Sequence, residues 1–371
     1  MSEPIKILHI VGRMDRGGTE ALLISLLHTI DHNKFQFDFV EQTQDECDYD
    51  KEILSLGSKI YRAPKISAKS LSEYRKWWTQ FYKEHPEYII IHGHSRGSAP
   101  VYLDEAKKAG RIAILHCHNN SHGAGIKGFI RYIWQLPLRN IAHYNFACSY
   151  DSGVSQFGKT GKFQVVKNGI RTSRYTWNDE IRKRVRTEWN IAENFVLGNV
   201  ARLCEQKNHV FLIKIFYELQ KICPEARLML IGQGHLEEQI RNQIKSLNIE
   251  DKVIFTGIRS DVNELMQAMD VFVLPSCFEG LGIVNVEAQA AGLPCFVSDK
   301  VIPPEVDITD LIHHIPLESS PKEWAKQIIE GRICLENRRD TSKDIIAAGF
   351  DIKSTADMLC DFYEGVINEK Q

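Results

Sequence analysis

Two glutamates, Glu279 and Glu287, lie on either side of a short glycine-containing segment in the last third of the chain. The apolar run 271–274 comes before this segment and an Ala-rich run follows it, so the sequence predicts a strand, a tight turn and a helix start. Such an arrangement binds charged ligands at the edge of a parallel sheet. Each carboxylate can accept two hydrogen bonds from neighbouring hydroxyl groups, which suits sugars and riboses. Acidic residues are also favoured near helix starts for electrostatic reasons alone, so both interpretations stay open at this point.

A pair of cations, Arg202 and Lys207, follows another predicted strand at 195–199. Two fixed positive charges beyond a strand end are suited to holding a diphosphate. A departing diphosphate gains negative charge as its bond breaks, so these cations would stabilise the transition state. Two solvated surface cations are the alternative.

Two glycine-rich segments also follow predicted strands. In the first, 12–20, a phosphate-binding P-loop would need Lys at position 18, and a dinucleotide fingerprint would need GxGxxG; neither is present. The adjacent Gly17 and Gly18 nevertheless allow backbone N–H groups to approach a ligand at the positive end of a helix. Gly232 lies in the second segment, 232–234, which is weak evidence by itself. Glycine turns that serve only packing are the alternative for both.

Histidines form the pattern His-x-His twice, at His92 and His94 and again at His116 and His118. In an extended segment the two rings of each pair share one face. A metal site is one interpretation, but no cluster of carboxylates or thiols nearby completes a coordination sphere. We therefore expect polar rings that line a cleft, with His118 the best candidate for contact with a reacting sugar.

The tripeptide Asp48-Tyr49-Asp50 has the DxD form with which many nucleotide-sugar enzymes hold a divalent cation. It lies in the acidic run 45–52, between a predicted strand and a predicted helix. We interpret it as a solvated loop and expect no metal.

The elements that must position these residues alternate between short apolar runs and longer amphipathic ones. This alternation predicts parallel sheets with helices on both faces. The pattern restarts after residue 170, so we expect two doubly wound units with a boundary in the polar stretch 171–194. The expected strands are 6–11, 35–40, 88–92, 111–116, 145–149, 195–199, 226–231, 253–256, 271–274 and 295–298, and the expected helices include 19–29, 209–219, 236–246, 262–269 and 350–367.

Composition is that of an ordinary two-domain globular protein. The 371 residues are 43% hydrophobic and 25% charged, and the net charge of -2 gives no support to nucleic-acid binding. Nine scattered cysteines without a CxxC pair indicate reduced thiols in the cytoplasm. The N-terminus lacks the long apolar region of a signal peptide, and no run approaches the ~18 apolar residues that span a bilayer.

Two segments mix basic and aromatic residues. The first, 69–85, contains Trp77 and Trp78, and the second, 127–143, contains Phe129, Tyr132 and Trp134. Either segment could rest on an anionic membrane surface. Amphipathic helices packed on the first sheet are the alternative.

Taken together, these motifs resemble those of the retaining glycosyltransferases of family 4, which have the two-domain GT-B fold. Glu279 through Glu287 fits the family's EX7E pattern, and the Gly17-Gly18 loop and the Arg202 and Lys207 pair match in order and spacing. The C-terminal segment 349–363 is similar to bacterial enzymes that assemble capsule and exopolysaccharide repeat units.

The resemblance implies a role for each motif. Glu287 would bind the donor's ribose and Glu279 the hydroxyls of the transferred sugar. The diphosphate would be held by Arg202 and Lys207, and His118 would approach the donor sugar from the first domain. The implied donor contacts are completed by Gly17, Gly18, Gly232, Ile258, Arg259, Gly280, Leu281, Gly282, Ile283 and Val284. Such enzymes are typically metal-independent, so no cofactor is expected.

The resulting expectation is a GT-B protein with an acceptor-side domain at 1–170, a donor-binding domain at 171–348, and a C-terminal helix, 349–371, that packs back on the first domain. The expected activity is retaining transfer of a hexose or N-acetylhexosamine from a nucleoside-diphosphate sugar, with UDP by family habit, to a saccharide or lipid-linked saccharide. Peripheral contact with the inner face of the plasma membrane would fit such an acceptor. The alternatives are an inverting GT-B transferase or epimerase with His118 as acid or base, and a non-catalytic nucleotide-sugar-binding subunit.

Overall fold

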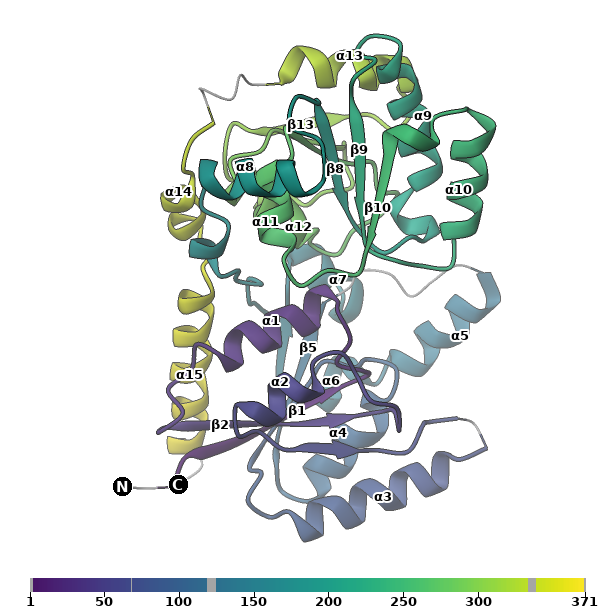
Figure 1. The fold of residues 1–371 in the computed structure, drawn as a ribbon. Coiled ribbons are helices and arrows are strands. Elements are labelled where there is room, and N and C mark those ends of the chain that lie inside the picture. Colours follow the sequence, from purple (N-terminus) through teal and green to yellow (C-terminus); the bar gives the residue numbers. More distant parts are fainter. Residues whose placement is uncertain (1–2, 68, 119–124, 333–337, 370–371) are drawn as a thin grey trace. The chain divides into compact units, whose positions relative to one another are not determined.

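The chain folds into two compact units, each built on its own parallel sheet (Figure 1). In this computed structural model, residues 3–67, 69–118, 125–332 and 338–369 are described. Unit 1 contains residues 1–169 and 352–371, and unit 2 contains residues 170–351. Each unit is described by itself below.

The sheet of unit 1 is parallel at every described pairing and has the order β3-β2-β1-β4-β5-β6-β7. The order reverses between β1 and β4, and in sheets of this kind ligands bind beyond the carboxyl ends of the strands at that reversal. The strands are β1 (Ile5–Val11), β2 (Phe35–Glu41), β3 (Ile60–Arg62), β4 (Ile90–Gly93), β5 (Ile112–Cys117), β6 (Tyr144–Ala147) and β7 (Gln164–Val165).

Helices cover both faces of this sheet. One core cluster joins the strands to α1 and α15, and a second joins the opposite face to α3, α4 and α6. The C-terminal helix α15 contributes Leu359, Tyr363 and Val366 to the first cluster, which makes it an integral part of unit 1. The helices of unit 1 are α1 (Gly18–Leu27), α2 (Asp50–Ser55), α3 (Leu71–Glu84), α4 (Ala99–Lys108), α5 (Gly125–Gln135), α6 (Leu138–Ile141), α7 (Tyr150–Phe157) and α15 (Ile352–Asn368).

The sheet of unit 2 repeats the same design with the order β10-β9-β8-β11-β12-β13, again parallel. Its order reverses between β8 and β11. The strands are β8 (Val196–Val200), β9 (Arg227–Ile231), β10 (Val253–Gly257), β11 (Val271–Leu274), β12 (Cys295–Ser298) and β13 (Ile312–Ile315).

Helices α9, α10 and α13 pack in the core cluster on one face of the sheet of unit 2. The α-helices of this unit are α8 (Asp179–Glu188), α9 (His209–Gln220), α10 (Glu237–Ser246), α11 (Val262–Ala268), α12 (Ile283–Ala290), α13 (Pro321–Gly331) and α14 (Ser342–Ala347). Four short 3-10 helices accompany them: η1 (Thr172–Arg174), η2 (Glu205–Lys207), η3 (Glu250–Lys252) and η4 (Pro304–Val306).

The polar stretch 171–194, in which we expected the domain boundary, is part of unit 2. Arg182 of α8 donates hydrogen bonds to the carbonyls of Gln267, Ala268 and Met269 and forms an ion pair with Asp270 at 2.5 Å. These are the carbonyls at the end of α11, which a cation stabilises. The stretch is therefore charged because it caps a neighbouring helix, and the division falls earlier, between residues 169 and 170.

Residues 349–351, which the sequence assigned to the C-terminal helix segment, also belong to unit 2. The backbone N–H of Ile170 donates to the carbonyl of Phe350 at 2.8 Å, and Ile170 pairs with Asp351 in a parallel bridge. Helix α15 begins only after this bridge, at Ile352.

The first basic and aromatic segment is a packed helix. In α3, Tyr74, Trp78, Phe81 and Tyr82 are buried in the core of unit 1. The membrane interpretation of this segment is therefore wrong, because its aromatic rings already have a protein partner.

Two further observations concern the chain as a whole. Among the described residues, none of the helices combines the length and hydropathy needed to cross a bilayer. The eight cysteines in the described part of the chain are free thiols.

Candidate active site

The predicted donor-site residues of unit 2 gather at one edge of its sheet. Arg202 and Lys207 follow β8, Gly232 follows β9, and Arg259 follows β10, while Glu279 follows β11. These four strands are parallel neighbours, so their carboxyl ends meet at the same edge. The reversal of strand order between β8 and β11 lies within this set, as expected for a ligand site.

Lys207 and Glu279 form an ion pair at the centre of this edge. The distance from Lys207 Nζ to Glu279 Oε1 is 2.6 Å, and their side chains are 17% and 5% exposed. Two further bonds tie η2 to the loop after β11: Gln206 donates its side-chain amide to the carbonyl of Phe278 at 2.9 Å, and Cys277 donates its N–H to the carbonyl of Gln206 at 2.8 Å. The sequence predicted both charges but not that they contact each other.

Arg202 differs from Lys207. It is exposed, and its guanidinium makes no ion pair with any residue that the structure describes. The sheet edge therefore offers one cation that is balanced by a buried carboxylate and one that is open to solvent.

The helix start after β11 is built around Gly282. This residue is the N-cap of α12 and has φ +71, a left-handed conformation that favours glycine. The neighbouring side chains of Leu281 and Val284 are buried. At a helix start the first backbone N–H groups lack intrahelical partners and carry partial positive charge, so this turn suits an anion. Segment 280–284 can thus contact a ligand through its backbone rather than through its side chains.

Glu287, one turn further along α12, has a partner that the sequence did not reveal. The hydroxyl of Tyr175 donates to Glu287 Oε1 at 2.8 Å. Burial raises the pKa of Glu287 to about 7, and the hydrogen bond from Tyr175 opposes that rise. Tyr175 follows η1 at the beginning of unit 2, far from α12 in the sequence, and no local pattern could have identified it.

Gly232 has a structural explanation of its own. Its φ is +128, and a Cβ atom at this position would lie 2.2 Å from the carbonyl oxygen of Ala201. Its N–H donates to the carbonyl of Gly257 at 2.9 Å, which links the ends of β9 and β10. Packing between three strand ends is therefore sufficient to require glycine here.

This geometry leads to a prediction for Gly232→Ala. The added methyl group forces the end of β8 to shift, so unit 2 should lose about 1–3 kcal/mol of unfolding free energy. Urea unfolding would measure the loss, with Gly12→Ala as control, because a Cβ at Gly12 meets nothing within 4 Å. Equal stability of the two variants would contradict this account of Gly232.

The residues after β10 present a cation and an apolar side chain. Arg259 forms a two-point ion pair with Asp261, with Nε–Oδ1 at 2.8 Å and Nη2–Oδ2 at 2.6 Å. Ile258 is exposed. An exposed apolar side chain next to a fixed guanidinium plane is able to pack against a flat ring.

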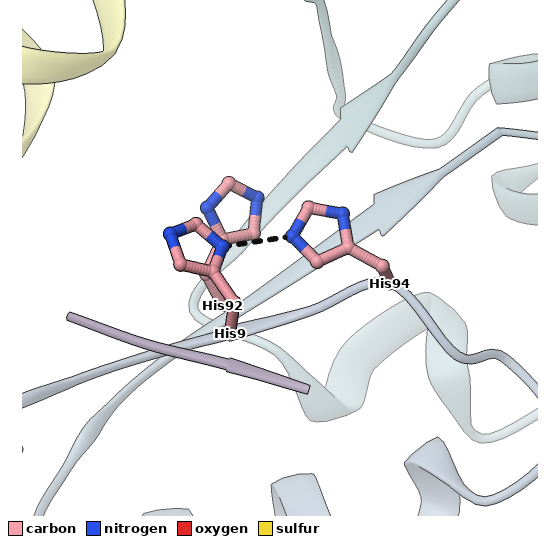
Figure 2. A group of neighbouring side chains, drawn as sticks. All are labelled: His9, His92 and His94. Carbon is pink, nitrogen blue, oxygen red and sulfur yellow. Dashed lines mark hydrogen bonds between the residues drawn. The ribbon is translucent and has the colours of Figure 1, made fainter. Parts of the chain in front are cut away.

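In unit 1, five histidines gather on one face of the sheet. Register pairs His9 of β1 with His92 of β4, and alternation places His94, His116 and His118 on the same face. Figure 2 shows His9, His92 and His94 with their rings together. Neighbouring rings lie 4.1–5.5 Å apart, centroid to centroid. The sequence predicted the two His-x-His pairs but not the participation of His9. Residues 119–124, which follow His118 directly and include Asn119, Asn120 and His122, lie outside the described residues.

Burial keeps these rings neutral. It lowers the pKa of His9 and of His118 to about 3, and it lowers the pKa values of His92, His94 and His116 well below the ordinary range. Charge on neighbouring groups adds to the effect, since the Arg96 guanidinium also lowers the pKa of His118.

Three of the rings form a hydrogen-bonded chain. His9 Nδ1 lies 3.0 Å from His94 Nε2 (dashed line in Figure 2), and His94 Nδ1 lies 2.9 Å from His118 Nε2. A neutral imidazole has one N–H and one bare nitrogen, so His94 must donate at one end and accept at the other. Both bonds therefore run in the same direction, and the proton position on His118 is coupled to that on His9.

The histidine nitrogens come close enough to suggest a metal site, in the groups His9, His92, His94 and His94, His116, His118. Neither group contains a carboxylate or a thiolate. Three neutral imidazoles can bind Zn²⁺, but the His9–His94 and His94–His118 hydrogen bonds already use ring nitrogens of both groups. We therefore assign no metal to the cluster.

The acidic run is also different from the solvated loop that we expected. Asp50 is 4% exposed, and both Asp50 and Glu41 form ion pairs with Arg62. Asp50 also accepts the N–H of Cys47 at 2.9 Å. Glu41, Cys47 and Asp50 lie close enough to hold a metal ion, but the guanidinium already supplies the positive charge that such an ion would bring.

The Gly17-Gly18 pair opens α1 at the edge of unit 1. Gly17 is the N-cap and is extended, with φ -155, which any residue can adopt. A Cβ on Gly17 would meet only the flexible end of the Glu20 side chain, at 2.4 Å. Neither backbone conformation nor packing against the main chain requires glycine at position 17, and glycine is also a favoured residue at an N-cap. The contact of Gly17 with a ligand therefore stays a prediction.

The chain is similar to known sugar-transferring proteins. Residues 181–348 match the family model described as glycosyl transferases group 1. Over 369 residues the chain is 30% identical to the putative glycosyltransferase EpsF of Bacillus subtilis strain 168, and the match covers 96% of each chain. Over 230 residues it is 30% identical to the UDP-Gal:alpha-D-GlcNAc-diphosphoundecaprenol alpha-1,3-galactosyltransferase of Escherichia coli, covering 57% of this chain and 58% of that one.

Solved structures establish the fold. Anabaena HepE, in complex with UDP and glucose, matches with a TM-score of 0.79 at 21% identity, over 97% of this chain and 100% of that one. WaaG, a glycosyltransferase involved in lipopolysaccharide biosynthesis, matches with a TM-score of 0.72 at 17% identity, over 96% and 99%. The predicted GT-B fold of two parallel-sheet domains is confirmed.

Proposed function

Since the chain belongs to the glycosyl transferases of group 1, we propose that it transfers a hexose or N-acetylhexosamine, with retention of configuration, from a UDP-sugar to a lipid-linked or free saccharide. The relative from Escherichia coli uses UDP-Gal and a diphosphoundecaprenol-linked acceptor. HepE, which has the same fold, was crystallised with UDP and with UDP-glucose. Together with the similarity to EpsF, these relatives favour a role in cell-surface polysaccharide synthesis at the inner face of the plasma membrane.

The observation that carries this proposal is the charge arrangement at the β8/β11 edge. The cation of Lys207, the open cation of Arg202 and the N-terminus of α12 all favour negative charge. The carboxylates of Glu279 and Glu287 favour hydroxyl groups. A nucleoside-diphosphate sugar combines a diphosphate with two hydroxyl-rich rings, so its chemistry matches the edge at both kinds of group.

For the reaction we propose that Arg202 and Lys207 stabilise the departing diphosphate. Glu279 orients the sugar, and Glu287 with Tyr175 holds the ribose. Among the described residues named at this edge, the carboxylates of Glu279, Glu287 and Asp261 are each engaged by another side chain. This engagement favours attack from the face that the diphosphate leaves. The departing phosphate oxygen then accepts the proton of the acceptor hydroxyl. With the cations in this role we expect no metal requirement.

The test is release of UDP from a panel of UDP-glucose, UDP-galactose and their N-acetylamino forms, with lipid-linked and free saccharide acceptors. NMR of the product's anomeric centre decides the stereochemistry, since an inverted product would contradict the retaining mechanism. A donor that raises the melting temperature without any UDP release would favour a binding subunit instead. Turnover that disappears with EDTA and returns with a divalent cation would contradict the metal-free proposal.

Arg202→Ala provides a more specific test. Because Arg202 is exposed and unpaired within the described residues, its removal should leave the melting temperature unchanged. Turnover should fall by at least about 10-fold through the loss of charge stabilisation at the diphosphate. Lys245→Ala, at an exposed lysine near the end of α10, is the control for loss of a surface cation elsewhere in unit 2. Normal turnover in Arg202→Ala would remove this residue from the site.

A further inference from the structure

Helix α5 has its apolar face turned away from the rest of unit 1. Ile126, Phe129, Ile130 and Ile133 are 80%, 65%, 61% and 48% exposed. Their spacing of i, i+3, i+4 and i+7 places them in one stripe along the helix. Figure 1 shows α5 extending outward from the sheet of unit 1 past α6.

The inward side of α5 is the less apolar one. Gly128 and Gln135 are buried there, and Tyr132 is partly buried. Trp134 donates its indole N–H to the carbonyl of Gly97 at 2.8 Å, which attaches the helix to the turn before α4. A helix that packs on a soluble core turns its apolar stripe inward. In α5 the apolar stripe lies on the outer side instead.

Other exposed apolar side chains do not form such a stripe. Leu54, Ile222 and Ile346 are each exposed in a different element or loop, which is normal for a protein surface. Helix α3, the other basic and aromatic segment, buries its rings. The stripe of α5 is therefore a local feature that needs a separate explanation.

The charge around α5 is of one sign. Segment 125–143, which contains α5 and α6, includes lysine and arginine but no aspartate or glutamate. The acid-free run extends further, from residue 106 to residue 150. Arg131 is exposed on α5 itself. An apolar stripe flanked by cations matches the interface of a bilayer that contains anionic lipids, where the stripe enters the acyl boundary and the cations meet the headgroups.

We propose that α5 is a membrane-surface anchor, which lies in the plane of an anionic bilayer and inserts Ile126, Phe129, Ile130 and Ile133. The anchor would hold unit 1 at the surface where a lipid-linked acceptor is found. In that respect the inference deepens the proposed function, although the exposed stripe and the charge pattern do not depend on the reaction.

The experiment is flotation of the full-length protein with vesicles of phosphatidylcholine, with and without one quarter phosphatidylglycerol. Wild-type protein should float with the anionic vesicles, bind pure phosphatidylcholine at least 10-fold less, and lose binding in 0.5 M NaCl. The double variant Phe129→Glu with Ile133→Glu should bind the anionic vesicles at least 10-fold less than wild type. The double variant Leu54→Glu with Ile222→Glu, with similarly exposed side chains elsewhere, should bind as wild type does.

UDP release with a water-soluble saccharide acceptor separates this proposal from the proposed function. Both double variants should retain it, so loss of flotation with normal turnover identifies an anchor. Flotation in the absence of any UDP release would support the anchor and contradict the transferase. Equal flotation of the α5 variant and wild type, or no flotation of wild type, would overturn the anchor. A lipid-independent dimer that the α5 variant converts to a monomer would assign the stripe to a second copy instead.

Discussion

Replacing Lys207 with alanine should damage both the stability and the activity of unit 2. The substitution leaves Glu279 buried without its cation, and breaking a buried ion pair from one side typically costs about 3–5 kcal/mol. Because Lys207 is 17% exposed, we expect the lower end, about 3 kcal/mol of unfolding free energy. Turnover should fall at least about 10-fold, and about 100-fold if Lys207 is the main cation at the diphosphate. Urea unfolding and initial rates of UDP release measure the two effects.

The double variant Lys207→Ala with Glu279→Ala separates the effect on stability from the effect on turnover. With both members of the ion pair removed, neither charge of the pair is left unbalanced, so most of the lost stability should return while turnover stays low. Lys183→Ala is the control, because its ion pair with Asp179, at 2.7 Å, is exposed and should be worth less than about 1 kcal/mol. If Lys207→Ala is no less stable than Lys183→Ala, the pair does not act as a buried unit. If the Lys207→Ala variant has normal turnover, then Lys207 does not stabilise the departing diphosphate.

Mild acid should unfold unit 1. Above pH 6.5 the five clustered histidines are neutral in both the folded and the unfolded chain, and they contribute no pH dependence. As the pH falls below 6.5, the unfolded chain gains protons that the folded rings cannot accept, since the pKa values of His9 and His118 are lowered to about 3. Stability is therefore present above pH 6.5 and is lost on acidification, by about 2 kcal/mol at pH 5 for each of His9 and His118.

For His9 and His118 together the loss at pH 5 is about 4 kcal/mol, a large part of the stability of a typical domain. The lowered pKa values of His92, His94 and His116 add to this loss in the same direction. Glu41 acts in the opposite direction, because burial raises its pKa to about 7 and the folded state then gains a proton first. That gain is about 2.5 kcal/mol at pH 5, which is smaller than the loss. Hydrogen exchange read by mass spectrometry from pH 7.5 to 5, corrected for the intrinsic rate, would resolve unit 1 from unit 2.

His116→Leu tests whether charging of the buried rings causes the acid sensitivity. Both ring nitrogens of His116 are buried and have no hydrogen-bond partner among the described residues. Leucine therefore removes no bond to those residues and should be tolerated at pH 7.5. Between pH 7.5 and 5 the variant should lose about 2 kcal/mol less than wild type. His32→Leu, at an exposed histidine, should follow wild type. If His116→Leu also follows wild type, then charging of the buried rings is not the source of the acid sensitivity.

The architecture was largely predictable because apolar periodicity reports burial directly. Strands β11 and β12 begin and end at the predicted residues, and α9 and α10 differ by one residue at one end. The short outermost strands β7 and β13 were not predicted. Gln164–Val165 is only two residues long, and Ile312–Ile315 contains two histidines, so neither has the apolar run that marks a buried central strand.

Polar segments were harder to interpret, because charge alone does not distinguish solvation from a specific partner. The stretch 171–194 and the acidic run 45–52 both contain residues that are buried against opposite charges or helix carbonyls. In each case the partner is distant in sequence or belongs to another element. The composition of the segment itself therefore cannot identify that partner.

Within the candidate site, the sequence by itself determined which groups follow which strands. Parallel strands bring their carboxyl ends to one edge, so Arg202, Lys207, Glu279 and Glu287 had to meet there once the alternation was recognised. The tertiary structure alone decided how they are paired: Lys207 with Glu279, Glu287 with Tyr175, and Arg202 left open. Hydrogen bonds and ion pairs form over about 3 Å, whereas sequence periodicity fixes only the face and the end of an element. The same limit explains why the sequence left two interpretations of α5 open, a membrane-surface segment and a packed amphipathic helix. Only the fold showed which side of this helix is exposed.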